Sequence, residues 1–280
     1  MTASQSPPPP SALWRSLLFV PGARSDRFEK ACAAGADLVC IDLEDAVAPG
    51  EKADARAATL AFLADYKDRP CGVGLRVNEV VTPEGAADLK AIVGATGLDF
   101  VMVPKVRGTA DLDAVHSAYG RDMLIPVLES ARAIQQADAI ADHGGVVAAL
   151  YGAIDLSADI GCDLSWDAHL YGRSRCAIAF GAARKVLFDS PYLDVRDADG
   201  LLKATKRSMA LGIHARCAIH PAQVDPIHAA YRPSAEAAAA AQRVVDAFEA
   251  AAGGVALLDG KLLELPVVKS AQRVLANVGR

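Results

Sequence analysis

The sequence lacks the patterns of several large protein classes. Its six cysteines include no Cys-x-x-Cys pair and match no zinc-ligand spacing, so they indicate buried thiols in a reducing compartment. No Lys/Arg-rich run occurs and the formal net charge is −5, which argues against a nucleic-acid-binding surface. No apolar stretch reaches the roughly 18 residues that a membrane-spanning helix requires. The first residues lack the charged start and apolar centre of a signal peptide, and we therefore expect a cytoplasmic protein.

Short apolar runs alternate with helical segments along most of the 280 residues. The runs predicted as strands are residues 17–20, 38–41, 73–78, 100–103, 124–128, 146–151, 187–193 and 215–219. A repeat of roughly 25–30 residues per strand and helix indicates βαβ units and a parallel sheet. Eight such units, without a Gly-x-Gly-x-x-Gly turn after the first strand, favour a (β/α)8 TIM barrel over a Rossmann sheet. The expected fold class is therefore α/β.

The same pattern divides the chain into three parts. Residues 1–12, which contain the proline run Pro7 to Pro10, are expected to form a disordered leader. Residues 13–232 are predicted to form the barrel. Residues 233–280 predict a helix, a hairpin turning at Asp259-Gly260 and a terminal helix that opens at Pro266. A barrel does not need this helix–hairpin–helix extension, so we expect it to be a lid or an oligomer contact.

Polar side chains close most of the predicted strands. In a barrel these positions meet at the active-site end. They are Asp42, Glu44, Asp45, Arg76, Asn78, Lys105, Glu129, Asp155 and His220. So many carboxylates in one place repel one another and raise their pKa values unless a cation balances them. Mg²⁺ is the economical cation, since it takes one or two protein carboxylates and leaves positions for water and substrate oxygens.

The residue types suggest a division of roles. Glu129 and Asp155 are the expected direct ligands of Mg²⁺, and Glu129 is thereby also expected to contact the substrate. The planar guanidinium of Arg76 suits a substrate carboxylate. Asp42, Glu44 and Asp45 would orient metal-bound waters or hold neighbouring loops. A metal and an arginine that face one small volume stabilise negative charge on oxygen, which favours cleavage or condensation of a carbon–carbon bond in a 2-oxo acid, thioester or enolate.

Two other residues allow alternative readings. Lys105 could form a Schiff base, although acidic residues surround it. His220, directly before Pro221, could act as a general base, although a structural histidine is the more frequent case at such a position. The cysteines have no nucleophile signature.

Several motifs together resemble a known enzyme family. They are Arg15-Ser-Leu-Leu-Phe-Val-Pro-Gly22, Ala36-Asp-Leu-Val-Cys-Ile-Asp-Leu-Glu-Asp-Ala46, Pro49-Gly-Glu-Lys52 with Arg56, Leu75-Arg-Val-Asn78, Val103-Pro-Lys105, Pro126-Val-Leu-Glu-Ser-Ala131, the stretch 152–156, Ala218-Ile-His-Pro221 with Gln223, and the Asp259-Gly-Lys segment. On these motifs the sequence is similar to the citrate lyase β-subunit-like branch of the HpcH/HpaI aldolase family, which includes malyl-CoA and citramalyl-CoA lyases. The resemblance covers nearly everything after the leader.

The resemblance implies a Mg²⁺-dependent carbon–carbon lyase on a TIM barrel, assembled as a trimer or a dimer of trimers. It implies Glu129 and Asp155 as metal ligands and Arg76 as the arginine that holds the substrate carboxylate. Glu44 and Asp45 would hold metal-bound waters. In relatives that act on CoA thioesters, the C-terminal segment of a neighbouring subunit covers the site and supplies an acid, which corresponds here to Glu264.

The sequence departs from the family pattern at two positions. Ile154 stands where the family usually has an acid, directly before the metal-ligand aspartate. Glu264 stands where the C-terminal acid is usually aspartate. One extra methylene changes the reach of a side chain by about 1.5 Å, and a misplacement of that size can cost on the order of a hundredfold in rate.

The sequence thus predicts a lyase that cleaves a β-hydroxyacyl-CoA of the malyl-, citramalyl- or citryl type through a metal-stabilised enolate. Arg76, Glu44, Asp45 and Glu264 are the residues expected to take part in catalysis, and Mg²⁺ is the expected cofactor. The alternatives are a CoA-independent class II aldolase acting on 4-hydroxy-2-oxo acids and a subunit of a larger lyase complex that is inactive alone. A thioester hydrolase on the same scaffold is a further alternative. The expected partners are an acyl-CoA or a short hydroxy or oxo acid and further copies of the chain, with neither nucleic acid nor membrane.

Overall fold

The computed structural model describes residues 14–251 and 257–278. The expected leader, residues 1–12, lies outside them. Contacts divide the chain into two compact units, residues 1–227 and 228–280. This division falls a few residues before the boundary predicted from the sequence, and the two units are described separately.

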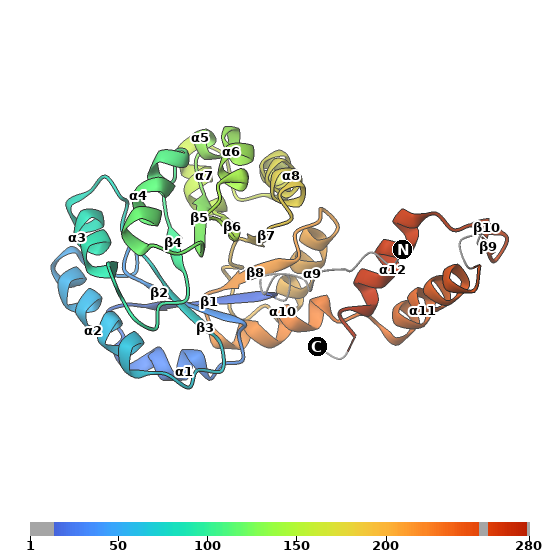
Figure 1. Ribbon diagram of the computed structural model, residues 1–280, viewed down its shortest axis with the longest axis horizontal. Helices are drawn as coiled ribbons and strands as arrows, with labels where there is room; N and C mark the ends of the chain where they lie inside the picture. The colour runs from blue at the N-terminus through green and yellow to red at the C-terminus, as the bar shows by residue number, and fades with distance from the viewer. Residues whose placement is uncertain (1–13, 252–256, 279–280) are drawn as a thin grey trace. The chain divides into compact units, whose positions relative to one another are not determined.

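The first unit is a closed barrel of eight parallel strands in sequential order. The strands are β1 (Ser16–Pro21), β2 (Leu38–Asp42), β3 (Gly72–Arg76), β4 (Val101–Val103), β5 (Leu124–Leu128), β6 (Ala148–Tyr151), β7 (Val186–Asp189) and β8 (Ala215–Ala218). β1 pairs with both β2 and β8, which closes the barrel. Figure 1 shows the helices arranged around these strands. The predicted (β/α)8 TIM barrel is confirmed.

The helices of this unit follow their strands in turn. They are α1 (Phe28–Cys32), α2 (Lys52–Asp65), α3 (Pro83–Ile92), α4 (Thr109–Tyr119), α5 (Ala131–Gln135), α6 (Ala137–Asp142), α7 (Ala153–Ile160), α8 (Trp166–Ala182) and α9 (Ala198–Met209), and α10 (Val224–Tyr231) crosses the unit boundary. Thr82 caps α3 by accepting a hydrogen bond from the Gly85 N–H at 3.0 Å, which explains the start of that helix.

Two local features add to what the sequence indicated. The residues after Glu129 form two short helices, α5 and α6, that meet at Gln136. A helix that the sequence did not predict, α7, begins directly after Gly152. Asp155, which was expected among the residues that close the strands, therefore lies in the first turn of this helix.

The barrel interior is filled by alternate residues of the strands. Leu17, Cys40, Phe100, Ile125 and Phe188 are among the buried residues of this core. A side chain at Gly74 would collide with the ring and carbonyl of Phe100, so glycine is required there for close packing. Because the interior is packed with apolar side chains, the polar residues that follow the strands are left at the mouth of the barrel.

The second unit contains α11 (Ala235–Ala250), the antiparallel strands β9 (Leu257–Leu258) and β10 (Lys261–Leu262), and α12 (Leu265–Leu275). Asp259 and Gly260 turn the hairpin with φ values of 50° and 75°, as a two-residue hairpin loop with both residues left-handed requires. Ala241 and Val245 of α11 pack with Ala271 of α12. The predicted helix–hairpin–helix is present, and its role as a lid or oligomer contact stays a prediction.

Neither unit, over the residues described, contains a helix that is both long and apolar enough to cross a membrane.

Candidate active site

A cavity of about 290 Å³ opens at the carboxyl ends of the barrel strands. Its polar lining consists of Asp42, Asp45, Arg76, Glu129, Asp155 and Ser190. The structure therefore brings together five residues that the sequence singled out separately, Asp42, Asp45, Arg76, Glu129 and Asp155. Phe19, Val127, Leu150 and Ile219 contribute apolar surface. A small cavity with convergent polar groups is typical of a site for a small molecule.

Glu129 follows β5 directly and is only 5% exposed. Its Oε1 accepts a hydrogen bond from the backbone N–H of Lys105 at 2.6 Å. Lys105 has φ of 51°, a left-handed conformation that is uncommon outside glycine and marks a constrained position. On the other side, a Cβ at Gly152 would lie 2.6 Å from the Cβ of Glu129. Two neighbouring strand ends thus fix the position of this carboxyl group.

The electrostatics of Glu129 fit a bound cation. Burial raises its pKa, the Lys105 N–H opposes this, and the nearby acids Asp155 and Glu44 raise it further, to about 8. A divalent cation held by Glu129 and Asp155 would lower the pKa of Glu129 again, because it would favour the ionised form of both carboxyl groups. Over residues 14–251 and 257–278, no group of three or more His, Cys, Asp or Glu side chains is arranged to hold a metal ion. Two carboxylates fit Mg²⁺, which completes its shell with water and substrate oxygens.

Arg76, the last residue of β3, is held by the acids that follow β2. Asp42 lies opposite Arg76 in the strand register and accepts hydrogen bonds from its Nε at 2.7 Å and its Nη2 at 2.6 Å. Nη1 lies 3.0 Å from Glu44 and 3.7 Å from Asp45. A bidentate arginine–carboxylate pair fixes the plane of the guanidinium. A substrate carboxylate can therefore use only the N–H groups of Arg76 that Asp42 and Glu44 leave open.

Glu44 is 5% exposed and lies between two cations. Its Oε2 is 3.0 Å from Arg76 Nη1 and its Oε1 is 2.8 Å from Lys105 Nζ. Neither oxygen has hydrogen-bond geometry with a described residue, so these contacts are ion pairs only. Burial raises the pKa of Glu44, and the two cations offset only part of this.

Lys105 has the wrong electrostatics for a Schiff-base lysine. Burial lowers its pKa, but the contact with Glu44 and the charges of Asp45 and Glu129 raise it to about 12. A lysine that attacks a carbonyl needs a lowered pKa so that its amine is neutral. The arrangement thus favours an ion-pair role for Lys105.

Sequence reasoning did not identify the role of Lys52, which holds the acidic segment in place. Its ammonium donates to the carbonyls of Leu43 and Glu44 at 3.0 Å and 2.9 Å and to Asn78 Oδ1 at 2.6 Å. Asn78 in turn donates from its backbone and its side chain to the buried Asp88. The motif that ends at Lys52 was visible in the sequence. A motif does not, however, reveal the contact between Lys52 and Asn78, which are 26 residues apart.

Ser190 was also missed. Its hydroxyl donates to the carbonyl of Tyr151 at 2.5 Å and accepts from the N–H of Ala153 at 2.8 Å. These bonds fix the start of α7 and thereby the position of Asp155. Ser190 directly follows β7, so its place at a strand end was the available signal.

The chain is similar to known proteins over most of its length. A model of the HpcH/HpaI aldolase/citrate lyase family matches residues 15–221, about three quarters of the chain. The chain belongs to this family. Because the family model describes aldolases and citrate lyases and similar proteins include a malyl-CoA lyase and a citramalyl-CoA lyase, the chain is an enzyme of the carbon–carbon lyase class.

Three relatives show how far the similarity extends. A (3S)-malyl-CoA thioesterase of Cereibacter sphaeroides is 35% identical over 271 residues, with 94% of each chain covered. The L-malyl-CoA/beta-methylmalyl-CoA lyase of the same species is 30% identical over 313 residues, with 97% of this chain and 96% of that one covered. The structure of the CitE protein of Mycobacterium tuberculosis in complex with magnesium, acetoacetate and coenzyme A superposes with a TM-score of 0.81 at 32% identity, covering 95% and 98% of the two chains.

Within the first unit, Glu44 and His220 belong to the motifs of the HpcH/HpaI resemblance but are not among the residues that line the cavity. Glu264 belongs to the second unit, where it is exposed and precedes α12 without capping it. His220 accepts a hydrogen bond from the N–H of Ala222 at 3.2 Å and so begins the short helical turn Pro221–Gln223. A structural role explains His220, and the catalytic role of Glu264 stays a prediction.

Proposed function

We propose that the protein is a Mg²⁺-dependent carbon–carbon lyase that cleaves a β-hydroxyacyl-CoA of the malyl-, citramalyl- or citryl type. The observation that supports this most strongly is the buried carboxyl group of Glu129 beside Asp155, in a cavity that also presents Arg76. The relative solved with magnesium, acetoacetate and coenzyme A supports the same cofactor and substrate class. The lyase relative named for malyl-CoA supports the same reaction.

Glu129 and Asp155 would hold Mg²⁺, which supplies a Lewis acid that stabilises negative charge on substrate oxygens. The open N–H groups of Arg76 would hold the substrate carboxylate, while Asp42 keeps the guanidinium in one plane. Orientation of this kind lowers the entropic part of the barrier. The apolar wall formed by Phe19, Val127 and Leu150 would limit the access of water to the reacting carbons.

Proton transfers complete the reaction. Asp45 lines the cavity and its side chain is 56% exposed, so it is the acid most available to accept the proton of the β-hydroxyl group. The electrons of that O–H bond form the carbonyl of the oxo fragment, and those of the broken carbon–carbon bond form the enolate of the acyl-CoA. Glu264 of a neighbouring copy would protonate the enolate carbon. This step requires a homo-oligomer, for which we propose a trimer or hexamer in the cytoplasm.

The direct test is turnover of malyl-, methylmalyl- and citramalyl-CoA by the purified chain with Mg²⁺, with 4-hydroxy-2-oxo acids assayed in parallel. The expected result is an oxo acid and a shorter acyl-CoA in equal amounts, lost with EDTA and in Glu129→Ala. Turnover that survives both EDTA and Glu129→Ala would refute the metal-dependent mechanism. Cleavage of the CoA-free substrates alone would identify the class II aldolase, and no turnover without added proteins would indicate a subunit of a complex.

Hydrolysis of the thioester is the second candidate function. The observation in its favour is that the thioesterase relative, at 35% identity, is more similar to this chain than the 30% identical lyase. The two reactions differ in product, because hydrolysis of malyl-CoA releases free CoA and malate, whereas cleavage of the carbon–carbon bond leaves the thioester intact. A thiol reagent added to the same assay therefore separates them.

A further inference from the structure

A second cavity, of about 550 Å³, lies beside the candidate active site and is larger than it. The two share Ala153, Ile154, Ser190 and Pro191 as lining residues. The second cavity is more basic than the candidate active site. Its charged lining consists of four basic side chains and two acids, Arg173, Lys203, Arg207, Arg216, Asp189 and Asp194. None of these six residues takes part in the proposed reaction.

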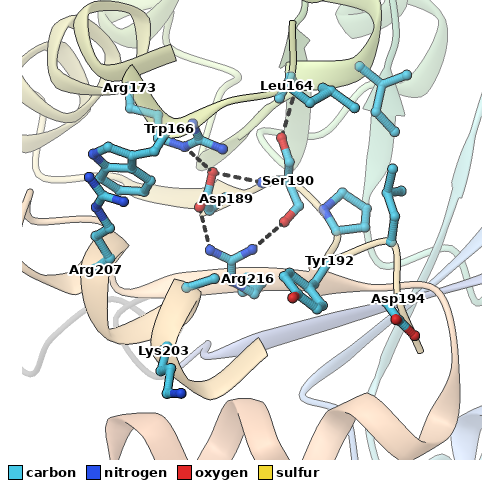
Figure 2. Close-up of a pocket in the computed structure, with 15 residues that line it drawn as sticks. Leu164, Trp166, Arg173, Asp189, Ser190, Tyr192, Asp194, Lys203, Arg207 and Arg216 are labelled. Atoms are coloured by element: carbon cyan, nitrogen blue, oxygen red, sulfur yellow. Dashed lines mark hydrogen bonds and ion pairs between the residues drawn. The ribbon is translucent and has the colours of Figure 1, made fainter. Parts of the chain in front are cut away.

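The inner part of this cavity contains more buried positive than negative charge (Figure 2). The side chains of Arg173 and Arg216 are 10% and 4% exposed, and both pair with Asp189, which is fully buried. Asp189 also accepts hydrogen bonds from the Ser190 N–H and the Ser208 hydroxyl, so its oxygens are saturated. The Nε of Arg216 is buried without a hydrogen-bond partner among the described residues. Two buried guanidiniums and one carboxylate leave a surplus charge that an anion would offset.

The outer part presents cations that are accessible to a ligand. Arg207 stacks on Trp166, with its guanidinium 4.4 Å from the ring centroid, as Figure 2 shows. The side chain of Arg207 is 57% exposed, and its ion partner Asp167, at 3.7 Å, is 91% exposed. A pair this exposed contributes little energy, so Arg207 can exchange Asp167 for another anion. Lys203 is four residues before Arg207 on α9, which places the two on one face of the helix.

Apolar surface lies next to these cations. Ile154, Leu164 and Leu193 line the cavity and are 47%, 50% and 52% exposed. Large apolar side chains that remain exposed beside fixed cations suit a ligand with both an apolar body and an anionic group. The cavity volume lies within the range of about 300–1,000 Å³ that is usual for small-molecule sites.

We propose that this cavity is a second ligand site, which binds a small organic anion with an apolar body and a phosphate or carboxylate group. Arg207 binds the anionic group from the rim, Arg216 and Arg173 supply the buried positive charge, and Leu164 and Leu193 contact the apolar body. The Nη1 of Arg216 donates to the carbonyl of Ser190 at 2.7 Å, and Ser190 fixes the start of α7. An occupant would therefore lie against the residue that positions Asp155.

The sequence allows a direct binding test, because the chain has only two tryptophans, Trp14 and Trp166. A Trp14→Phe background makes Trp166 the sole indole reporter. Phenyl phosphate is the probe, titrated without Mg²⁺, and binding is followed by Trp166 fluorescence and independently by calorimetry. We expect a saturable change, and Arg207→Gln should weaken binding at least tenfold.

Two controls make the result specific. Lys206→Gln alters an exposed cation on the same helix that does not line the cavity, and it should change the dissociation constant less than twofold. Glu129→Gln alters the candidate active site and should leave binding unchanged. Absence of saturable binding, binding by Arg207→Gln as tight as by the parent, or loss of binding in Glu129→Gln would each overturn the proposal. Fluorescence and calorimetry both measure binding and not turnover, so the outcome is independent of the proposed lyase reaction.

Discussion

Two buried carboxyl groups at strand ends of the barrel, with β6 between their strands, have opposite electrostatic environments. Glu129, after β5, is 5% exposed, and burial together with the nearby acids raises its pKa to about 8. Asp189, at the end of β7, is fully buried, and burial alone would raise its pKa, but Arg216 and Arg173 lower it below its ordinary value. The Asp189 cluster thus contains its own counterions, whereas Glu129 does not. A divalent cation at Glu129, as we propose, would supply the counterion that Arg216 and Arg173 supply to Asp189.

The largest expected effect comes from breaking the buried ion pairs of Asp189. Arg216→Met removes one partner of a fully buried ion pair and leaves Asp189 with Arg173 alone. Breaking such a pair costs about 3–5 kcal/mol, and urea denaturation measures the loss. Arg207→Met, at a largely exposed position of the same cavity, is the matched control and should stay within about 0.5 kcal/mol of the parent. Equal effects of the two variants would contradict the description of the cluster as a buried ion pair.

Glu129→Gln should stabilise the folded protein when Mg²⁺ is absent, whereas Arg216→Met destabilises it. The pKa of Glu129 in the folded protein, about 8, is above the ordinary value of 4.5. As the pH rises between these two values, the unfolded chain releases a proton that the folded chain retains, so the folded state loses relative stability. Without Mg²⁺, the parent should therefore lose on the order of 1–3 kcal/mol between pH 5 and pH 8 that Glu129→Gln retains. Denaturation at both pH values, with and without Mg²⁺, tests this, and identical pH profiles for parent and variant would contradict it.

Binding of Mg²⁺ should itself depend on pH. A carboxyl group must be ionised to bind the metal, so binding below pH 8 releases the proton of Glu129. The apparent affinity should rise by up to about tenfold from pH 6 to pH 7, since one proton is released per metal bound. Calorimetry in two buffers of different ionisation enthalpy measures the number of protons released per Mg²⁺ bound. A pH-independent affinity would contradict release of a proton by Glu129 on metal binding.

The smallest effect is expected at Lys105, whose side chain is 40% exposed. Lys105→Met removes one of the two cations beside Glu44 and should cost about 1 kcal/mol or less. It should reduce turnover without abolishing it, because Lys105 forms no covalent intermediate in the proposed reaction. Inactivation of the parent by borohydride in the presence of an oxo acid would instead reveal a Schiff base.

The sequence was sufficient to predict the barrel, because eight apolar runs alternate with helices at a regular spacing. It also located Glu129, since an acid directly after an apolar strand must lie at the barrel mouth. It was less informative about Asp155, which belongs to the unpredicted helix α7. The hydrogen bonds of Ser190 that start this helix join residues from two different strand ends, and no local pattern encodes them.

Contacts across elements explain the remaining differences between sequence and structure. The sequence indicated that Arg76 faces the site, but not that Asp42 occupies one edge of its guanidinium. That contact arises from the strand register, which places the two residues side by side. The cluster of Asp189, Arg173 and Arg216 draws on β7, α8 and β8. Each of its residues, read alone, is an ordinary charged residue in a strand or helix, so only the fold reveals that they are buried together.

Titration calorimetry with Mg²⁺ at pH 8 tests the central claim most directly, which is that Glu129 and Asp155 form a metal site. The parent should bind one Mg²⁺ per chain, and Glu129→Gln and Asp155→Asn should each weaken binding by on the order of a hundredfold while keeping the parent's fold. Asp194→Asn, which alters an acid of the second cavity, should bind as the parent does. Stoichiometric binding of Mg²⁺ that persists unchanged in both Glu129→Gln and Asp155→Asn would contradict the account.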